Sequence, residues 1–241
     1  MHPFVSVVVP TKDRRDFIPQ LLRCYRQQDY PLDRMELVVL DDGADPIGDL
    51  LDGVPGVRYI RRNTPEPIGR KRNVLAGESR GDVIVHMDDD DYYPRTRVSH
   101  AVRRLAESGL PVAGASRMHI FYVRTGRIGV CGPFGPYHAT CNTMAYRRNY
   151  LDTHRYDDSC RAGEEPAFTG NFTEPMVQLD SLKTILCVGH TSNTYDKRRV
   201  VTADADVRLK DIVTCKTSLS FYRYQLPRRL DVDPLPVRQA R

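Results

Sequence analysis

The chain has 241 residues, of which 40% are hydrophobic and 28% charged, as is usual for a globular protein. Frequent Val-, Ile- and Leu-rich segments exclude disorder over the whole chain, and no run of about 18 apolar residues is present to span a membrane. The net charge of +5 is too small to demand nucleic acid as a partner, and we expect none.

The N-terminus and the cysteines bear on the cellular compartment. Residues 1–4 lead directly into a strand-like segment, without the basic and hydrophobic regions of a secretory signal. The six cysteines form no C-x-x-C pair and have no zinc-like spacing. We therefore expect a cytoplasmic protein whose thiols are reduced.

The first half of the chain alternates between short apolar runs and segments with helical spacing. The predicted strands are residues 4–9, 36–40, 57–61 and 82–87, and the predicted helices are residues 14–28, 68–80 and 94–107. Nearly continuous apolar strands that alternate with helices indicate βαβ units. The fold class predicted is therefore α/β, Rossmann-like, with a mostly parallel central sheet flanked by helices.

The second half is less regular. We expect an extended segment at residues 112–123, helices near residues 143–150 and 163–170, and a strand at residues 184–188. Residues 226–241 are rich in Pro and Arg and show no period, which predicts a tail or linker. A solvated tail, peripheral contact with a membrane surface, and a linker within a longer multidomain chain all remain open for this segment.

Polar residues follow three of the predicted strands, at Pro10–Thr11, Asp41–Asp42 and Asp88–Asp91. Ligands of open α/β sheets bind outside the carboxyl ends of the strands. Four successive aspartates repel one another, and a divalent cation is the simplest compensation, because Mg²⁺ and Mn²⁺ prefer oxygen ligands and share carboxylates with phosphates. The alternative is a solvated acidic turn that caps the helix beginning at Pro94.

Two further groups could bind a nucleotide. Asp42 can accept hydrogen bonds from a base or a ribose, or it can form an Asx turn with Gly43. The basic run Arg70–Arg72 can hold a pyrophosphate, whereas its alternative is a solvated helix face. Three successive helical residues cannot all face one site, so we expect one or two of them to be functional.

Four segments of the first half carry a resemblance to a known family. They are Val5–Thr11, Glu36–Gly43, Gly69–Asn73 and Gly81–Asp91. In this order they resemble successive elements of the family 2 glycosyltransferases, and the last resembles the segment with the metal-binding D-x-D motif. The resemblance implies a GT-A fold in one domain. Residues 1–110 would form the nucleotide-sugar-binding half, and residues 111–225 the half with the acceptor site and the catalytic base.

The resemblance also implies roles for single residues. Asp42 would contact the base of the nucleotide, Asp88 would lie near the ribose, and Asp13 stands where the family usually has Asn. Asp88 and Asp90 fill the outer positions of D-x-D, with Asp90 on the metal, and a register shift to Asp89 or Asp91 stays open. The implied nucleotide-binding residues are Pro10, Thr11, Asp13, Asp42, Arg70, Arg72, Asp88 and Asp89.

The second half of the chain resembles the family only loosely, so its roles rest on fewer residues. Glu164–Glu165 replaces the usual Glu-Asp pair, and Glu165 is our choice for the general base, followed by Glu164 and then by Asp157–Asp158. A helix N-terminus is the structural alternative for the Glu pair. His190 is either a further metal ligand or a structural histidine. Asn142 and Thr143 stand where the family approaches the sugar.

The activity implied is a metal-dependent, inverting transfer of a sugar from a nucleotide diphosphate sugar to an acceptor hydroxyl. UDP-sugars are the favoured donors, Mn²⁺ or Mg²⁺ the cofactor, and a glycan or glycoprotein the acceptor. Two alternatives remain, a non-catalytic domain that binds nucleotide sugars and a sugar nucleotidyltransferase. The second is disfavoured because the loop Thr11–Arg14 lacks the glycines expected after its first strand.

Overall fold

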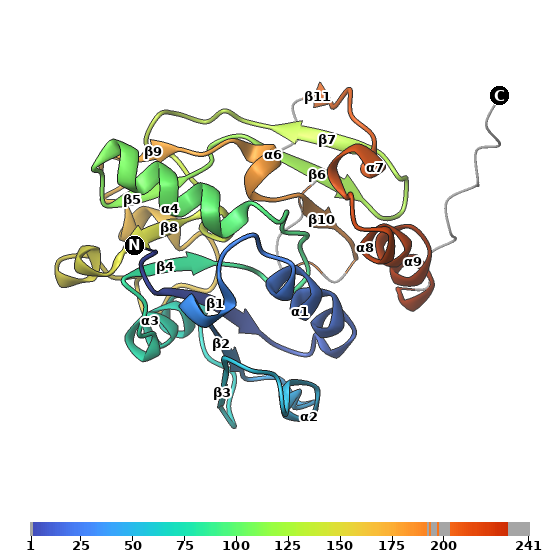
Figure 1. Ribbon diagram of the computed structural model, residues 1–241, viewed down its shortest axis with the longest axis horizontal. Helices are drawn as coiled ribbons and strands as arrows, with labels where there is room; N and C mark the ends of the chain where they lie inside the picture. Colours follow the sequence, from blue (N-terminus) through green and yellow to red (C-terminus); the bar gives the residue numbers. More distant parts are fainter. Residues whose placement is uncertain (1, 192, 194–196, 198–202, 231–241) are drawn as a thin grey trace.

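A computed structural model describes residues 2–191, 193, 197 and 203–230. Seven strands form the larger sheet, which runs from β3 at the lower end of Figure 1 to β9 near the top. Their order is β3 (Val57–Arg61), β2 (Met35–Asp41), β1 (Val5–Thr11), β4 (Val83–His86), β8 (Ala145–Arg147), β5 (Val112–Gly114) and β9 (Val177–Gln178). β8 runs antiparallel to both of its neighbours, and the other neighbouring pairs run parallel. The predicted α/β architecture is confirmed.

Both faces of this sheet are covered at its central strands β1, β2 and β4, which explains why these strands are mostly apolar. Successive side chains of a strand point to opposite faces. Val7 of β1 belongs to the core cluster that includes side chains of α1 (Ile18–Arg26) and α4 (Arg97–Ser108). Val8 belongs to the cluster on the other face, together with Leu75 of α3 (Ile68–Glu78). The helices predicted in the first half are thus confirmed, on the two faces of the sheet.

The second half adds a smaller sheet and short helices, beside one another at the upper right of Figure 1. This sheet has the order β10 (Cys187–Gly189), β6 (Met118–Tyr122), β7 (Ile128–Cys131) and β11 (Ala203–Asp204). Over the whole of the described ranges, the 3₁₀ helices are η1 (Arg15–Phe17), η2 (Leu32–Arg34), η3 (Cys141–Thr143) and η4 (Arg148–Asp152), and η6 (Phe221–Gln225) is a π-helical turn. The short α-helices are α2 (Gly48–Leu51), α5 (Glu165–Phe168), α6 (Ser181–Thr184), α7 (Leu209–Ile212), α8 (Lys216–Ser220) and α9 (Leu226–Arg229).

One prediction for the second half is wrong, and the start of the predicted tail differs in the structure. The helix expected at residues 143–150 is a strand, β8, flanked by η3 and η4. Pairing with β4 and β5 and the burial of Tyr146 outweigh the local helical pattern. The predicted tail begins as α9, and Leu226 is fully buried in the main core. Residues 231–241 lie outside the described part of the chain.

No helix in the described ranges is both long and apolar enough to cross a membrane.

The register of the sheet sets the position of the polar residues. Thr11 at the end of β1 lies opposite Asp41 at the end of β2, and β4 pairs with the other side of β1. The loops that follow these three strands therefore leave the sheet at the same edge, as the sequence predicted.

Candidate active site

The loops after β1, β2 and β4 are joined by short hydrogen bonds. Thr11 Oγ1 donates to Asp89 Oδ2 at 2.5 Å. The ammonium of Lys71 on α3 donates to the Thr11 carbonyl at 2.8 Å and to Asp42 Oδ1 at 2.5 Å. All four side chains are buried. The predicted convergence at this edge of the sheet is therefore present, and Lys71 is a member that the sequence analysis left out.

Asp13 and Asp42 also order the backbone around this edge. Asp42 Oδ2 accepts a hydrogen bond from the Glu66 amide at 2.7 Å, and Asp13 Oδ1 accepts one from the Ala44 amide at 2.6 Å. Asp13 has a φ of 53°, a left-handed conformation that Asp tolerates better than most residues. A Cβ on Gly43 would lie 2.5 Å from the Asp13 amide nitrogen, so the loop after β2 requires glycine there. Nucleotide contact by Asp13 and Asp42 stays a prediction.

Arg72 connects the two halves of the site. Its guanidinium is buried and donates to Glu164 Oε1 at 2.7 Å, to Asp88 Oδ1 at 3.2 Å and to His86 Nδ1 at 3.0 Å. Because an arginine only donates, His86 Nδ1 accepts and the proton resides on Nε2, which faces Tyr146 at 3.2 Å. The family resemblance implies that Arg72 either faces the phosphates or braces the aspartates, and its contacts favour the bracing role.

Arg70, one residue before Lys71, has a different environment. Its side chain is 60% exposed and lies 3.7 Å from Glu66, four residues earlier and outside α3, in an ion pair. The prediction that at most two residues of the basic run face the site agrees with this geometry, but the inward pair is Lys71 and Arg72. A phosphate contact by Arg70 remains a prediction.

The four aspartates after β4 differ in their surroundings. Asp91 is buried, and its carboxylate accepts hydrogen bonds from the Val188 amide at 2.8 Å, Asn142 Nδ2 at 2.8 Å and Lys197 Nζ at 3.1 Å. These bonds tie Asp91 to the smaller sheet and leave it little capacity for a ligand. Asp88 and Asp90 are partly exposed, which favours the D-x-D register that they define.

Charge and burial separate the pKa values of these carboxyl groups. Burial raises the pKa of Asp88 to about 6, against the lowering effect of Arg72. Burial and the charge of Asp90 raise the pKa of Asp89 well above its usual value. For Asp90, burial is outweighed by the charge of Lys197 and the hydrogen bond from His190, so its pKa is lowered. Asp90 is therefore the member of the quartet that is most firmly ionised.

Asp90 and His190 form an edge that fits a divalent cation. Asp90 Oδ2 lies 3.0 Å from His190 Nε2, and two adjacent ligands of an octahedral ion with bonds of about 2.1 Å are about 3.0 Å apart. In the described part of the chain, no three His, Cys, Asp or Glu side chains form a complete metal cage. Such an edge suits an ion that takes its other ligands from phosphates and water.

Asn193 lies at the same edge. Its Nδ2 is 3.1 Å from Asp90 Oδ2 and 3.0 Å from His190 Nε2, and its Oδ1 accepts from the His190 amide at 2.6 Å. The His190 ring also stacks on Phe17 of η1. Asn193 and Lys197 were not predicted, because the amino-acid sequence around them shows no strand pattern and no motif that would place them.

Glu164 and Glu165 begin α5 on the other side of Arg72. The Arg72 ion pair outweighs burial and lowers the pKa of Glu164. Burial and the charge of Glu164 raise the pKa of Glu165, whose Oε1 accepts from the Cys141 amide at 2.9 Å. Neighbouring carboxylates whose pKa values are driven apart often have separate acid and base roles. Glu165 as the base stays a prediction that this difference favours.

The two residues expected near the sugar are buried in η3, just before β8. Asn142 Nδ2 donates to Asp91, and the Thr143 hydroxyl donates to the Thr140 carbonyl at 2.7 Å and accepts from the Ala115 amide at 3.0 Å. These bonds shape the loop that carries the Cys141 amide. Direct contact of Asn142 or Thr143 with a sugar has no support in this geometry and stays untested.

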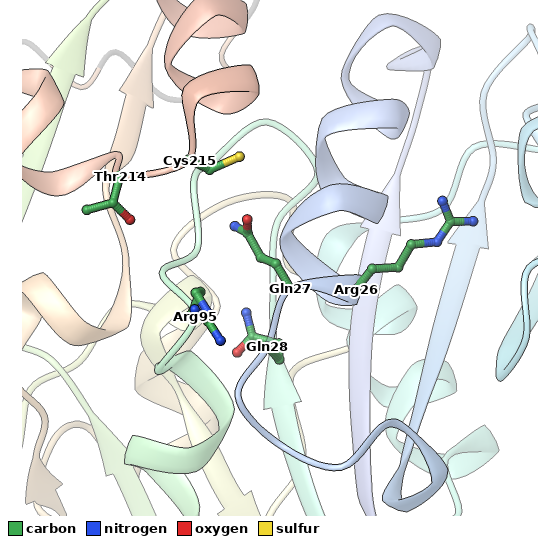
Figure 2. Close-up of a pocket in the computed structure, with 6 residues that line it drawn as sticks. All are labelled: Arg26, Gln27, Gln28, Arg95, Thr214 and Cys215. Carbon is green, nitrogen blue, oxygen red and sulfur yellow. The ribbon is translucent and has the colours of Figure 1, made fainter.

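A cavity of about 450 Å³ lies away from this site, at the far end of α1 (Figure 2). Its lining residues are Arg26, Gln27, Gln28, Arg95, Thr214 and Cys215. Arg26 ends α1, whereas Phe17, which touches His190, precedes it. A helix of nine residues places these ends about 13 Å apart. None of the predicted site residues lines this cavity.

The family model described as Glycosyl transferase family 2 matches residues 6–168. The chain belongs to this family. The match begins in β1 and ends with α5, so it includes the acidic residues, Arg72 and the Glu164–Glu165 pair. The predicted family is confirmed.

Curated relatives match shorter stretches. An undecaprenyl-phosphate 4-deoxy-4-formamido-L-arabinose transferase of Pseudomonas syringae pv. syringae is 33% identical over 124 residues, 47% of this chain and 36% of the relative. The poly(ribitol-phosphate) beta-N-acetylglucosaminyltransferase TarS of Staphylococcus aureus (strain Mu50) is 29% identical over 108 residues, 42% of this chain and 19% of the relative. The chain thus spans well under half the length of these relatives.

Solved structures agree with the fold. S. aureus TarS 1-349 in complex with UDP-GlcNAc has a TM-score of 0.62 at 20% identity, covering 78% of this chain and 59% of that one. The mannosyltransferase PcManGT from Pyrobaculum calidifontis, in complex with GDP-Man and Mn²⁺, also has a TM-score of 0.62, at 16% identity, covering 80% of this chain and 59% of that one. The predicted GT-A fold is confirmed.

Proposed function

We propose that this chain transfers a sugar from a nucleotide diphosphate sugar, with UDP-sugars favoured, to a hydroxyl group of a glycan, with inversion at the anomeric carbon. The observation that carries the proposal is that the buried guanidinium of Arg72 links the acidic loop after β4 to the glutamate pair at the start of α5. Arg72 contacts Asp88 on the side of the acidic loop and Glu164 beside the candidate base. Donor and acceptor chemistry would then meet on either side of Arg72.

Each of these residues would do one part of the reaction. Thr11, Asp42 and Asp88 would orient the nucleotide, and Asp90 with His190 would hold the cation. A bound Mg²⁺ or Mn²⁺ would supply charge neutralisation for the departing diphosphate. Glu165, whose raised pKa makes it a stronger base, would accept the proton of the acceptor hydroxyl as the new bond forms. Positioned base catalysis of this kind contributes about 10²–10⁴-fold.

Nucleotide release tests the proposal. The purified chain is incubated with Mn²⁺ and UDP-glucose, UDP-GlcNAc or GDP-mannose, and the free nucleotide is measured with and without a mixture of oligosaccharides. Glu165→Gln should lower release at least 100-fold and leave the Kd for UDP within threefold, because the base acts in the chemical step. Asp90→Asn should abolish Mn²⁺-dependent UDP binding in calorimetry.

Asp157→Asn is the control, since Asp157 is the alternative base and its exposed carboxylate bonds to Ser159. It should keep the rate of the unmodified chain. Binding of UDP-sugars without release under any condition would identify a non-catalytic binding domain. Formation of a nucleotide sugar from a sugar phosphate and a nucleoside triphosphate would identify a nucleotidyltransferase.

A further inference from the structure

Three aromatic rings from two separate segments contact one another, with His138 between Phe134 and Phe172. The ring centroids of Phe134 and His138 are 4.8 Å apart, and His138 stacks on Phe172 at 4.5 Å with an interplanar angle of 24°. Phe134 is 48% exposed, and Tyr137 in the same loop is 41% exposed. We name these four residues, Phe134, Tyr137, His138 and Phe172, the aromatic platform.

The backbone beneath the aromatic platform is held in place. Gln178 Nε2 donates to the Pro136 carbonyl at 2.8 Å and to the His138 carbonyl at 3.1 Å. The Phe134 amide donates to the Ser116 carbonyl at 3.2 Å. These three hydrogen bonds join the loop to β9 and to the segment between β5 and β6, so little conformational freedom remains to be lost when the rings bind a ligand.

Phe172 adopts a strained backbone. Its φ is 61°, and the φ of Asn171 before it is 56°, both in the left-handed region that bulky L-residues avoid. Such residues persist only where their surroundings impose them, and they concentrate at ligand clamps and active sites. The left-handed conformation of Phe172 is energetically unfavourable, and the surrounding structure imposes it where the ring of Phe172 stacks on His138. Together with the exposed rings, this strain points to binding.

The aromatic platform borders the candidate base from both of its segments. The Cys141 amide bonds to Glu165 Oε1, and His138 precedes Cys141 by three residues, at most about 11 Å of chain. On the other segment, the Asn171 amide donates to the Pro166 carbonyl at 2.7 Å, which turns the chain back toward the start of α5. A ligand on these rings would therefore lie within about two sugar units of Glu165.

We propose that the aromatic platform binds the acceptor glycan by stacking against the apolar face of a pyranose ring. This rests on the proposed function, whose acceptor it specifies. The faces of aromatic rings carry partial negative charge and attract the polarised C–H groups of one sugar face. The sugar hydroxyls project from the ring edge, where they remain available to polar groups and water. An exposed apolar patch beside a polar centre is typical of a ligand site.

The absence of tryptophan from the sequence gives a direct test. Phe134→Trp keeps an aromatic ring and introduces one indole, whose emission is titrated with chito-oligosaccharides, cello-oligosaccharides and malto-oligosaccharides. At least one series should give a saturable shift in emission. Phe172→Ala in the Phe134→Trp background should raise the Kd at least tenfold, because it removes the ring beneath His138. Leu32→Trp, at a site that is 52% exposed on η2, is the control and should show no shift.

Three results would overturn the proposal. They are an equal shift in Leu32→Trp, no shift with any oligosaccharide, and a shift only with vesicles that contain anionic phospholipid or undecaprenyl phosphate, which would mark a membrane contact. The indole titration needs neither donor nor metal. Calorimetry with UDP and Mn²⁺ reports separately on the proposed function, so failure of one is distinguishable from failure of the other.

Discussion

Arg72 is the residue on which most of the site depends. It is buried, and its three bonded partners come from β4, from the loop after β4 and from the turn before α5. A guanidinium can serve these partners together because its donors form a planar fork, whereas an ammonium is a single point of charge. Removal of one partner from a buried ionic network leaves uncompensated charge, which is strongly destabilising.

Arg72→Lys should therefore lower kcat about 100-fold and the free energy of unfolding by about 2 kcal/mol. Arg97→Lys is the matched control, because Arg97 is equally buried but donates to the carbonyls of His86 and Met144. It should lower stability similarly and leave kcat within threefold. Steady-state kinetics and urea denaturation measure both. If kcat falls equally in the two variants, Arg72 has only a structural role.

At the residue scale, the sequence predicted where charged residues stand at the ends of strands better than it predicted which side chains contact them. Asp42, Asp88 and Asp90 were found because they end apolar strands, and that rule depends only on the order of the strands. Lys71 was not among the predicted site residues, whereas Arg70 and Arg72 were, because helical spacing cannot show which of three adjacent basic residues points inward. Lys197 and Asn193 approach Asp91 and Asp90 across about 100 residues of chain, and no local pattern encodes such contacts.

The helix that carries Lys71 and Arg72 depends on a glycine for its position. A Cβ on Gly69 of α3 would lie 1.9 Å from the Asp157 carbonyl oxygen, whereas a Cβ on Gly77, two turns later, would meet nothing within 4 Å. Gly69→Ala should displace α3 and lower the free energy of unfolding by about 2 kcal/mol. Gly77→Ala should raise it by about 0.5–1 kcal/mol, since alanine favours the helix. Thermal denaturation compares the two, and equal effects would contradict the close contact.

The contact between α4 and the segment before α6 should depend on pH. His100 Nε2 accepts a hydrogen bond from the Asp180 amide at 3.1 Å, which requires a neutral ring. Burial, with the nearby charge of Arg103, lowers the pKa of His100 to about 4. The unfolded chain therefore binds the proton first, and stability is lost as the pH falls from about 6.5 towards 4.

His100→Gln should remove this loss, because glutamine can accept the same bond without titrating. Between pH 7 and pH 4.5 the unmodified chain should lose roughly 2 kcal/mol more of its unfolding free energy than His100→Gln does. Urea denaturation at each pH measures the difference. Parallel curves for the two proteins would mean that His100 titrates alike in the folded and unfolded chains.

Among the elements, the sequence predicted best those strands that are covered on both faces of the sheet. β1, β2 and β4 are buried on both sides, so most of their residues are apolar and the strands are recognisable in spite of the buried polar residues Ser6 and Glu36. β8 is three residues long, and its pairing with β4 and β5 decides its conformation, so its local sequence predicted a helix instead. α9 was missed for a similar reason, since Leu226 packs against residues far away in the sequence.

For the whole molecule, ligand binding should appear as added stability. A ligand that binds only the folded chain, at 100 times its Kd, raises the free energy of unfolding by about 2.7 kcal/mol. For a chain of this size that corresponds to roughly 5–10 °C in Tm. UDP with Mn²⁺ should produce this shift in differential scanning calorimetry, and EDTA should abolish it. A shift that survives EDTA would show that the nucleotide binds without the cation.

The place of β8 in the larger sheet has a consequence for synthesis on the ribosome. β4 ends at His86, but its second neighbour begins only at Ala145. At translation speeds of about 5–20 residues per second, the nascent chain carries an unpaired, apolar β4 edge for several seconds. Slowing of elongation between these two points would lengthen the interval in which newly made chains can associate with one another.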